Sequence, residues 1–218
     1  MEIREIQSTL NLHYGAAPRT PGFHVSELLR PVALSLGMWK KDDQDELDFT
    51  LAKYHAARGE NIVQMYPTAI YRVAVGLAVE DWLGRQKPEI NFHALGELAK
   101  DGIIGTPDGL EFDRDGGIIH EIKATWKSSR SDRESPMERL RKEWYWTAQA
   151  CSYCYLASFG KELVRRAQLH IWWLNGNYQG SGPEYKTYEI SYSSPEVGAN
   201  WRLVEAKRDE ALRGELVL

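Results

Sequence analysis

The clearest periodic pattern along the chain is a helical one at residues 67–83. Pro67 suits the first turn of a helix and Gly84 suits its end. Apolar side chains recur at the i, i+3, i+4, i+7 spacing of a buried face, at Ile70, Val73, Ala74 and Leu77. The next position of this stripe is Glu80, and a carboxylate on a buried stripe is costly unless it is neutralised. Glu80 is therefore either an edge residue that reaches solvent or an arginine, or a metal ligand or supporting carboxylate.

A strand pattern follows between residues 102 and 125. The apolar segment 102–106 is interrupted by Pro107-Asp108-Gly109, and a second strand is expected at 110–113. The turn at 114–117 contains an Asp-Gly pair, which is a strong hairpin signal between apolar runs. The segment 118–125 is therefore predicted to return alongside the preceding strand.

A long helix is predicted after this hairpin, at residues 136–159. Ser135 and Glu138 are spaced for a capping box, Pro136 suits the first helical position, and Gly160 suits the end of the helix. The other expected helices are 25–36, where Pro31 is an awkward interior residue, 45–58 and 195–213. The other expected strands are 168–174 and 185–192.

This order of elements predicts a mixed α/β fold. We expect a helical N-terminal region at 1–66, packed on a core at 67–218 that ends in a C-terminal helix. The chain has 218 residues, of which 43% are hydrophobic and 27% charged, as in a globular protein with a sizeable core. No apolar run approaches the roughly 18 residues of a membrane span, and the first residues lack the apolar region of a secretory signal. A cytoplasmic protein without a membrane partner is expected.

Charge and cysteine content exclude some function classes. The net charge of −4 is unlike that of a protein that coats nucleic acid, yet residues 121–142 carry seven Lys or Arg against four acids. A local basic groove on an acidic enzyme remains compatible with these numbers. Cys151 and Cys154 alone cannot complete a tetrahedral zinc site or a four-thiolate cluster.

The strongest chemical signal lies on the returning strand of the hairpin. Side chains alternate along a strand, so Glu121 and Lys123 are expected on one face. The hairpin should bring Asp108 close to both. Two converging carboxylates repel each other unless a cation lies between them, and hard oxygen ligands suit Mg²⁺ or Mn²⁺. Such a metal polarises a phosphodiester and lowers the pKa of a bound water, while Lys123 either orients that water or serves as base.

These residues resemble a known family. Gly105-Thr106-Pro107-Asp108 followed by Glu121-Ile122-Lys123 is similar to the signature of PD-(D/E)XK nucleases, and Gln149-Ala150-Cys151-Ser152-Tyr153 is similar to the QxxxY motif of its RecB-type branch, which includes lambda-type exonucleases. The resemblance covers about residues 70–160 and the strand after them. It implies a restriction-endonuclease-like core, in which a mixed central β-sheet is flanked by helices.

Carried over by position, the resemblance implies metal ligands at Asp108, Glu121 and the backbone carbonyl of Ile122, with Lys123 catalytic. It places Gln149 near the reacting phosphate. Two departures are visible. Where RecB-type modules often carry a metal-binding histidine, this chain has Gly76, so either Glu80 replaces that ligand or the hairpin acids act alone. Two cysteines instead of four argue against an iron–sulfur cluster.

Contacts with DNA are expected from the helix and the loop beside the motif. Gln149 and Tyr153 lie one turn apart on one helix face, and Trp146 extends that face. The resemblance directs this face to the DNA strand, whereas the aromatics are also explained as core residues. Lys127 and Arg130 follow the motif strand, where they either grip phosphates or lie on a solvated loop.

The function predicted from these features is metal-dependent hydrolysis of DNA. The resemblance favours an exonuclease in recombination or DNA end processing, of phage or bacterial type. The alternatives are an endonuclease of restriction or junction-resolving type, a catalytically silent DNA-binding or regulatory module, and an accidental motif in an unrelated enzyme. A single-strand annealing or recombination protein and a homo-oligomer remain open as partners.

Overall fold

The computed structural model describes part of the chain. The described residues are 21–38, 74–76, 78–79, 81–82, 85, 96–129, 136–158, 163–176 and 182–215. The chain divides into two compact units, 1–21 with 42–75, and 22–41 with 76–218. The predicted helix at 45–58 and the predicted boundary at residue 66 lie outside the described residues and stay predictions. Every element named below belongs to the second unit.

The larger described sheet has the order β4-β5-β6-β7. Its strands are β4 (Gly109–Asp113), β5 (Gly116–Thr125), β6 (Arg166–Trp173) and β7 (Glu184–Ser191). The strands β4 and β5 pair antiparallel, β5 and β6 parallel, and β6 and β7 antiparallel. The predicted hairpin and the two later strands are therefore confirmed, with ends that shift by one or two residues. The turn begins β5 at Gly116, whose φ of 112° is a conformation that glycine adopts without strain.

A smaller sheet lies next to the hairpin in the chain. It joins β1 (Phe23–His24), β3 (Ile103–Gly105) and β2 (Leu98–Lys100), in that order. Only β3 was predicted, as part of the apolar segment 102–106. The strands β1 and β2 are too short to show an alternating pattern. The three residues Thr106, Pro107 and Asp108 connect β3 of the smaller sheet to β4 of the larger one. Asp108 therefore lies where the chain passes from one sheet to the other.

The predicted long helix is two helices in the structure. The helix α4 (Pro136–Lys142) ends before Glu143, and α5 (Trp144–Leu156) begins after it. Glu143 has φ −107° and ψ 37°, which is outside the helical region, and its side chain is buried. A continuous helix at 136–159 was therefore a wrong prediction, and at the break the buried carboxylate of Glu143 pairs with Lys127 of another segment, which no helical pattern can reveal. The predicted caps at Ser135 and Gly160 lie outside the described residues.

The other described helices agree with the sequence patterns. The helix α1 (Val25–Ser35) runs through Pro31 without a break. The helix α6 (Ser194–Leu212) starts with a capping box in which Ser193 and Glu196 exchange hydrogen bonds. Parts of the predicted helix 67–83 are helical where they are described, at residues 74–76, 78–79 and 81–82.

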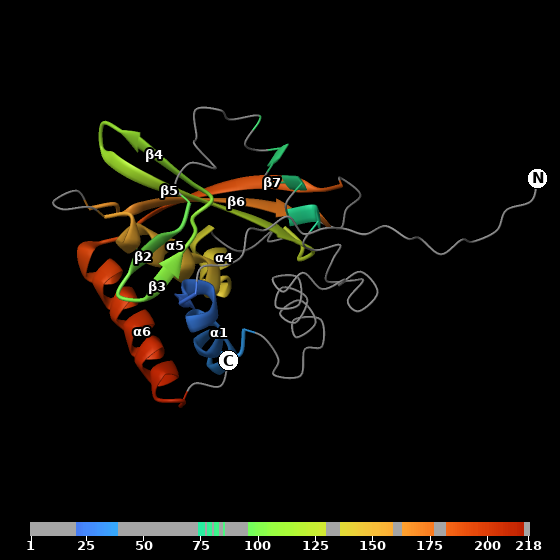
Figure 1. The fold of residues 1–218 in the computed structure, drawn as a ribbon. Coiled ribbons are helices and arrows are strands. Elements are labelled where there is room, and N and C mark those ends of the chain that lie inside the picture. The colour runs from blue at the N-terminus through green and yellow to red at the C-terminus, as the bar shows by residue number, and fades with distance from the viewer. Residues whose placement is uncertain are drawn as a thin grey trace, which may run out of the picture. The chain divides into compact units, whose positions relative to one another are not determined.

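Figure 1 shows the layers of this unit: α5 lies against the larger sheet, and α1 and α6 pack beyond it. The core between them includes Ile119 and Leu169 from the sheet, Cys154 from α5, Leu28 from α1 and Trp201 from α6. The predicted mixed α/β class, with a mixed sheet flanked by helices, is confirmed, and its assignment to a restriction-endonuclease-like core stays a prediction. Among the described residues, none of the helices combines the length and the apolar composition that crossing a membrane requires.

Candidate active site

Asp108 meets the motif strand as predicted. In the hairpin, Gly109 pairs with His120, which places Asp108 next to Glu121 in register. The carboxylate oxygen Oδ2 of Asp108 accepts a hydrogen bond of 2.6 Å from the backbone amide of Ile122. This bond fixes the carboxylate of Asp108 against β5. The position of Asp108 thus depends on the passage between the two sheets as well as on the hairpin.

Glu121 and Lys123 stand side by side on one face of β5. The ammonium of Lys123 forms an ion pair and hydrogen bond with Oε1 of Glu121, and both side chains are largely buried. Burial by itself lowers the pKa of Lys123, but the charges of Glu121 and Asp108 and the hydrogen bond to Glu121 outweigh burial. The pKa of Lys123 is therefore raised above its usual value. The ammonium of Lys123 thus balances the charge of Glu121, whereas the predicted metal ion between the two carboxylates stays a prediction.

Gln149 joins this group from α5. Its Oε1 accepts a hydrogen bond of 3.1 Å from Lys123 Nζ, and its Nε2 donates one of 2.7 Å to the hydroxyl of Tyr153. A continuous chain of hydrogen bonds therefore runs from Glu121 through Lys123 and Gln149 to Tyr153. We call these four residues, together with Asp108 next to Glu121, the catalytic chain, after the role proposed below. Because Gln149 gives its oxygen to the ammonium and its amide to the hydroxyl, its orientation is fixed at both ends.

Tyr153 is a buried support in this chain. Its side chain is only 4% exposed. Burial and then the charge of Glu121 raise the pKa of Tyr153, so the hydroxyl keeps its proton. The ring packs on Gly105, where an added Cβ would come within 2.7 Å of a ring carbon. The contact of Tyr153 with DNA stays a prediction. In the structure the hydroxyl of Tyr153 accepts the hydrogen bond that orients Gln149.

Lys127 and Trp146 lie together at the other end of α5. The ammonium of Lys127 lies 2.9 and 2.6 Å from the two carboxylate oxygens of Glu143 and 5.4 Å from the centre of the Trp146 ring. Trp146 is partly buried and packs against Trp173, with ring centres 6.3 Å apart. The charge of Lys127 is thus balanced by Glu143, a residue that the sequence analysis did not single out. Contacts of Lys127 and Trp146 with DNA stay predictions.

Three predicted site features receive no geometric test. Glu80 and Arg130 lie outside the described residues. The amide of Ile122 binds Asp108, while the role of its carbonyl as a metal ligand stays a prediction. Within the described ranges, no group of three or more His, Cys, Asp or Glu side chains is placed to hold a metal ion.

The carboxylates of Asp108 and Glu121 nevertheless fit a magnesium site. Both lie close enough to Lys123 and Tyr153 to affect the pKa of each. Proteins usually bind Mg²⁺ through one or two carboxylates, with waters and substrate phosphates completing its coordination. The chemistry of this pair therefore suits a hard divalent cation, and binding of such an ion stays a prediction.

A second polar chain lies on the opposite face of β5. His120 Nδ1 and His170 Nε2 are 2.9 Å apart, and His170 Nδ1 is 2.7 Å from the hydroxyl of Tyr185. Glu111 approaches His120 Nε2 at 3.3 Å. We call these four residues the histidine chain. The histidine chain links all four strands of the larger sheet. It was not predicted from the sequence, because His120 and His170 are 50 residues apart.

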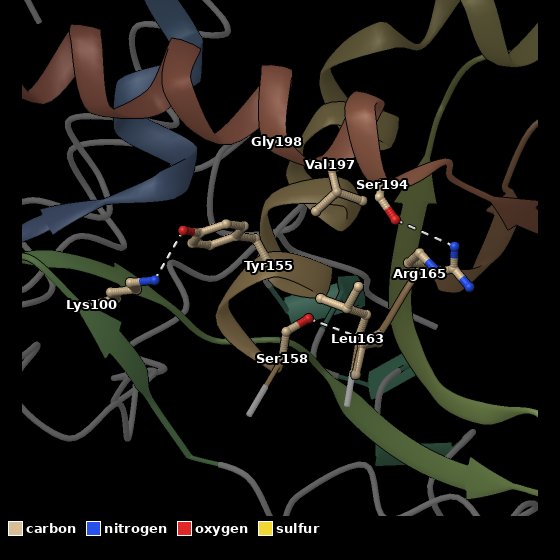
Figure 2. Close-up of a pocket in the computed structure, with 9 residues that line it drawn as sticks. Lys100, Tyr155, Ser158, Leu163, Arg165, Ser194, Val197 and Gly198 are labelled. Atoms are coloured by element: carbon tan, nitrogen blue, oxygen red, sulfur yellow. Dashed lines mark hydrogen bonds between the residues drawn. The ribbon is translucent and has the colours of Figure 1, made fainter. Parts of the chain in front are cut away.

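A surface pocket lies away from the catalytic chain, at the ends of α5 and α6. It has a cavity volume of about 230 Å³, and Lys100, Tyr155, Leu163, Arg165 and Val197 are among the residues that line it (Figure 2). Lys100 donates a 2.9 Å hydrogen bond to the hydroxyl of Tyr155. None of the predicted site residues lines this pocket.

Comparison with known proteins gives no match to a protein-family model and none to a curated protein. The solved structures to which the chain is similar include the following three. The protein SSO0001 is 20% identical, with a TM-score of 0.41 and coverage of 89% of this chain and 79% of its own. An alkaline exonuclease from Laribacter hongkongensis is 13% identical, with a TM-score of 0.35 and coverage of 89% and 93%. A candidate exonuclease from Eubacterium rectale is 11% identical, with a TM-score of 0.43 and coverage of 98% and 89%. These TM-scores lie below 0.5, so the similarity by itself says nothing about activity.

Proposed function

We propose that this protein is a metal-dependent deoxyribonuclease. The observation that carries the proposal is the convergence of Asp108, Glu121, Lys123 and Gln149 at the meeting point of the two sheets and α5. Two acids that can hold a divalent cation, with a lysine beside them, are suited to metal-assisted hydrolysis of a phosphodiester. The motifs quoted from the sequence add a preference for an exonuclease acting in recombination or end processing.

The metal in this proposal is Mg²⁺ or Mn²⁺. Asp108 and Glu121 would hold it, and the carbonyl of Ile122 is the expected third protein ligand. When bound, such an ion polarises the scissile phosphate and makes a bound water more acidic. The protein's own contribution is to keep two carboxylates together, which the ammonium of Lys123 and the amide of Ile122 both assist.

The two hydrogen bonds that Lys123 donates, to Glu121 and to Gln149, support the role of a cation over that of a base. A protonated ammonium has three donors, of which one reaches Glu121 and one reaches Gln149. The third donor is available to a phosphate oxygen or to the attacking water. Gln149 fixes the direction of that donor, and Tyr153 in turn fixes Gln149. The chain thus orients Lys123 before any substrate arrives.

The decisive experiment is digestion of DNA labelled at one end, single- and double-stranded, with Mg²⁺, with Mn²⁺ and with a chelator. We expect cleavage that depends on the metal and falls at least about 100-fold in Lys123→Ala. The matched control is Lys207→Ala, because Lys207 is also paired with a carboxylate but lies on α6. Near-normal turnover in Lys123→Ala would exclude the mechanism.

The ends of the substrate separate the alternatives. An exonuclease needs a free terminus, so circular DNA and duplexes with blocked ends should resist it. Cleavage of circular DNA would identify an endonuclease instead. Binding of DNA without cleavage under every metal condition would identify a catalytically silent DNA-binding module.

A further inference from the structure

The pocket at the ends of α5 and α6 has no part in the proposed cleavage, and its lining is positively charged. Its volume is about 230 Å³. The lining includes two cations, Lys100 and Arg165, and no carboxylate among the described residues. The charges of Asp101 and Glu205 act on Lys100, but neither of these acids lines the pocket. The lining therefore favours a ligand with negative charge.

Neither of these cations forms an ion pair with a carboxylate in the described part of the chain. The adjacent Arg166, by contrast, is paired with Asp113. Lys100 and Arg165 donate their hydrogen bonds to neutral hydroxyl groups instead. A paired cation has most of its field cancelled by its partner, whereas an unpaired one still attracts an anion.

Each cation is joined to a hydroxyl group that can itself donate a hydrogen bond. Lys100 donates a 2.9 Å hydrogen bond to the hydroxyl oxygen of Tyr155, and Arg165 donates one of 3.4 Å to that of Ser194. A hydroxyl that accepts from a cation keeps its own hydrogen for another acceptor. Among the described residues, no acceptor takes either hydroxyl hydrogen. The lining therefore offers two donor pairs, Lys100 with Tyr155 and Arg165 with Ser194.

The two donor pairs lie on opposite sides of an apolar part of the pocket. Figure 2 shows the side chains of Val197 and Leu163 between the two pairs. The ring of Tyr155 is stacked on Trp201, with ring centres 4.3 Å apart, so the hydroxyl of Tyr155 is held in place. A ligand that uses both donor pairs must therefore have two acceptor groups separated by an apolar spacer.

We propose that this pocket binds a small organic dianion, in which a short apolar spacer joins two anionic groups. Each anionic group accepts hydrogen bonds from one donor pair, and the spacer lies against Leu163 and Val197. Hydrogen bonds between charged groups are stronger than neutral ones, so the two ends dominate the affinity. The volume of about 230 Å³ is below the usual range for drug-sized ligands, which favours a ligand of few atoms. Binding at this pocket does not depend on the proposed nuclease function.

The test is an NMR titration of the full-length wild-type protein with succinate, glutarate and adipate. The matched probes are the monocarboxylates of the same chain length, and sodium chloride at the same ionic strength. We expect the backbone amides of Ser158, Val197 and Gly198 to shift in a saturable way. The best dicarboxylate should bind about 5- to 10-fold more tightly than its monocarboxylate, because its second anionic group reaches the second donor pair. Alkane bisphosphonates with the same spacers form a second series, and the series that binds more tightly identifies the anionic group.

Variants at each end of the pocket separate the two donor pairs. Lys100→Gln and Arg165→Gln each remove one charge, and each should lower the affinity for the best dianion about 5- to 10-fold, to that of the singly charged probe. Tyr155→Phe keeps the ring beside Trp201 and removes one donor, so the loss should be about 3-fold. Arg213→Gln is the matched control, because Arg213 is an exposed arginine that follows α6 and is paired with a carboxylate. It should leave the affinity unchanged.

Two results would overturn the dianion site. The first is equal affinity of the wild type for singly and doubly charged probes, or shifts that sodium chloride reproduces. The second is wild-type affinity in both Lys100→Gln and Arg165→Gln. Metal-dependent cleavage of DNA by the wild type would be unaffected by either result. Failure of cleavage, in turn, would leave the binding of a dianion at this pocket unaffected.

Discussion

The two faces of β5 carry two hydrogen-bonded chains that differ in charge. The catalytic chain places two carboxylates around one ammonium, with Gln149 and Tyr153 behind it. The histidine chain contains two imidazoles and a hydroxyl, and its carboxylate, Glu111, lies at the partly exposed end. The members that lie on β5 at the centre of the two chains, Glu121 and His120, are buried, and both chains end in a tyrosine.

The difference suggests separate tasks for the two faces. Burying a cluster of charges is costly. Such clusters are therefore found where a substrate or a metal ion interacts with the charges. A hydrogen-bonded chain of polar groups contributes to stability once every member is satisfied. We therefore expect substitutions in the catalytic chain to change activity first, and substitutions in the histidine chain to change stability first. The following predictions are ordered from the largest effect to the smallest.

The largest effect is expected for Asp108, through its charge. Asp108→Asn keeps an oxygen that accepts from the Ile122 amide but removes the negative charge. We expect cleavage to fall at least about 100-fold and the affinity for Mn²⁺ at least about 10-fold, while the midpoint of unfolding hardly changes. Asp108→Ala should show the same losses with an additional loss of stability, because the amide then lacks this acceptor. Calorimetric titration with Mn²⁺ that shows wild-type affinity in Asp108→Asn would remove Asp108 from the metal site.

The next effect is on stability and comes from the opposite face. His170→Ala removes the partner that lies 2.9 Å from His120 and leaves a cavity in a fully buried position. We expect the free energy of unfolding in urea to fall by about 2–4 kcal/mol. The turnover of the protein that remains folded should stay within a few-fold of the wild type. A specific loss of turnover with unchanged stability would show that the histidine chain takes part in catalysis, and would end the proposed division between the two faces.

The smallest effects compare the two terminal tyrosines. Tyr153→Phe removes the hydroxyl that accepts from Gln149, so the amide loses one of its two fixed ends. We expect kcat to fall about 3- to 10-fold with KM little changed, because the orientation of Lys123 is affected and DNA contacts are not. Tyr185→Phe is the matched variant, since its hydroxyl bonds to His170 on the other face. It should leave kcat unchanged and lower the free energy of unfolding by about 1 kcal/mol or less. Equal kinetic effects in both variants would contradict the comparison.

Some of this site was predictable because it depends on local rules. The alternation of side chains along a strand places Glu121 next to Lys123, and the Asp-Gly turn returns the strand beside Asp108. The helical spacing of Gln149 and Tyr153 predicts that their side chains meet, and they do so at 2.7 Å. These relations join residues that are near in sequence or follow one repeating geometry.

Other features depend on partners that are distant in sequence. The helix break at Glu143 accompanies its ion pair with Lys127, although the surrounding residues favour a continuous helix. The segment 126–129, which follows β5, is hydrogen-bonded to Asn175 and Gly176. The parallel pairing of β5 with β6 brings these two residues alongside the segment. A local pattern carries no information about such partners, since each residue is compatible with many environments until the sheet forms.

The sequence by itself determined the hairpin, the face shared by the acid and the lysine, and the glutamine–tyrosine pair, because backbone geometry repeats over a few residues. The tertiary structure decided that Gln149 reaches Lys123 and that two histidines meet on the other face of β5. It also decided that Asn175 bonds to the backbone carbonyl of Trp126. These outcomes required segments 26 to 50 residues apart to be packed together. Packing selects one among the many pairings that the local preferences allow.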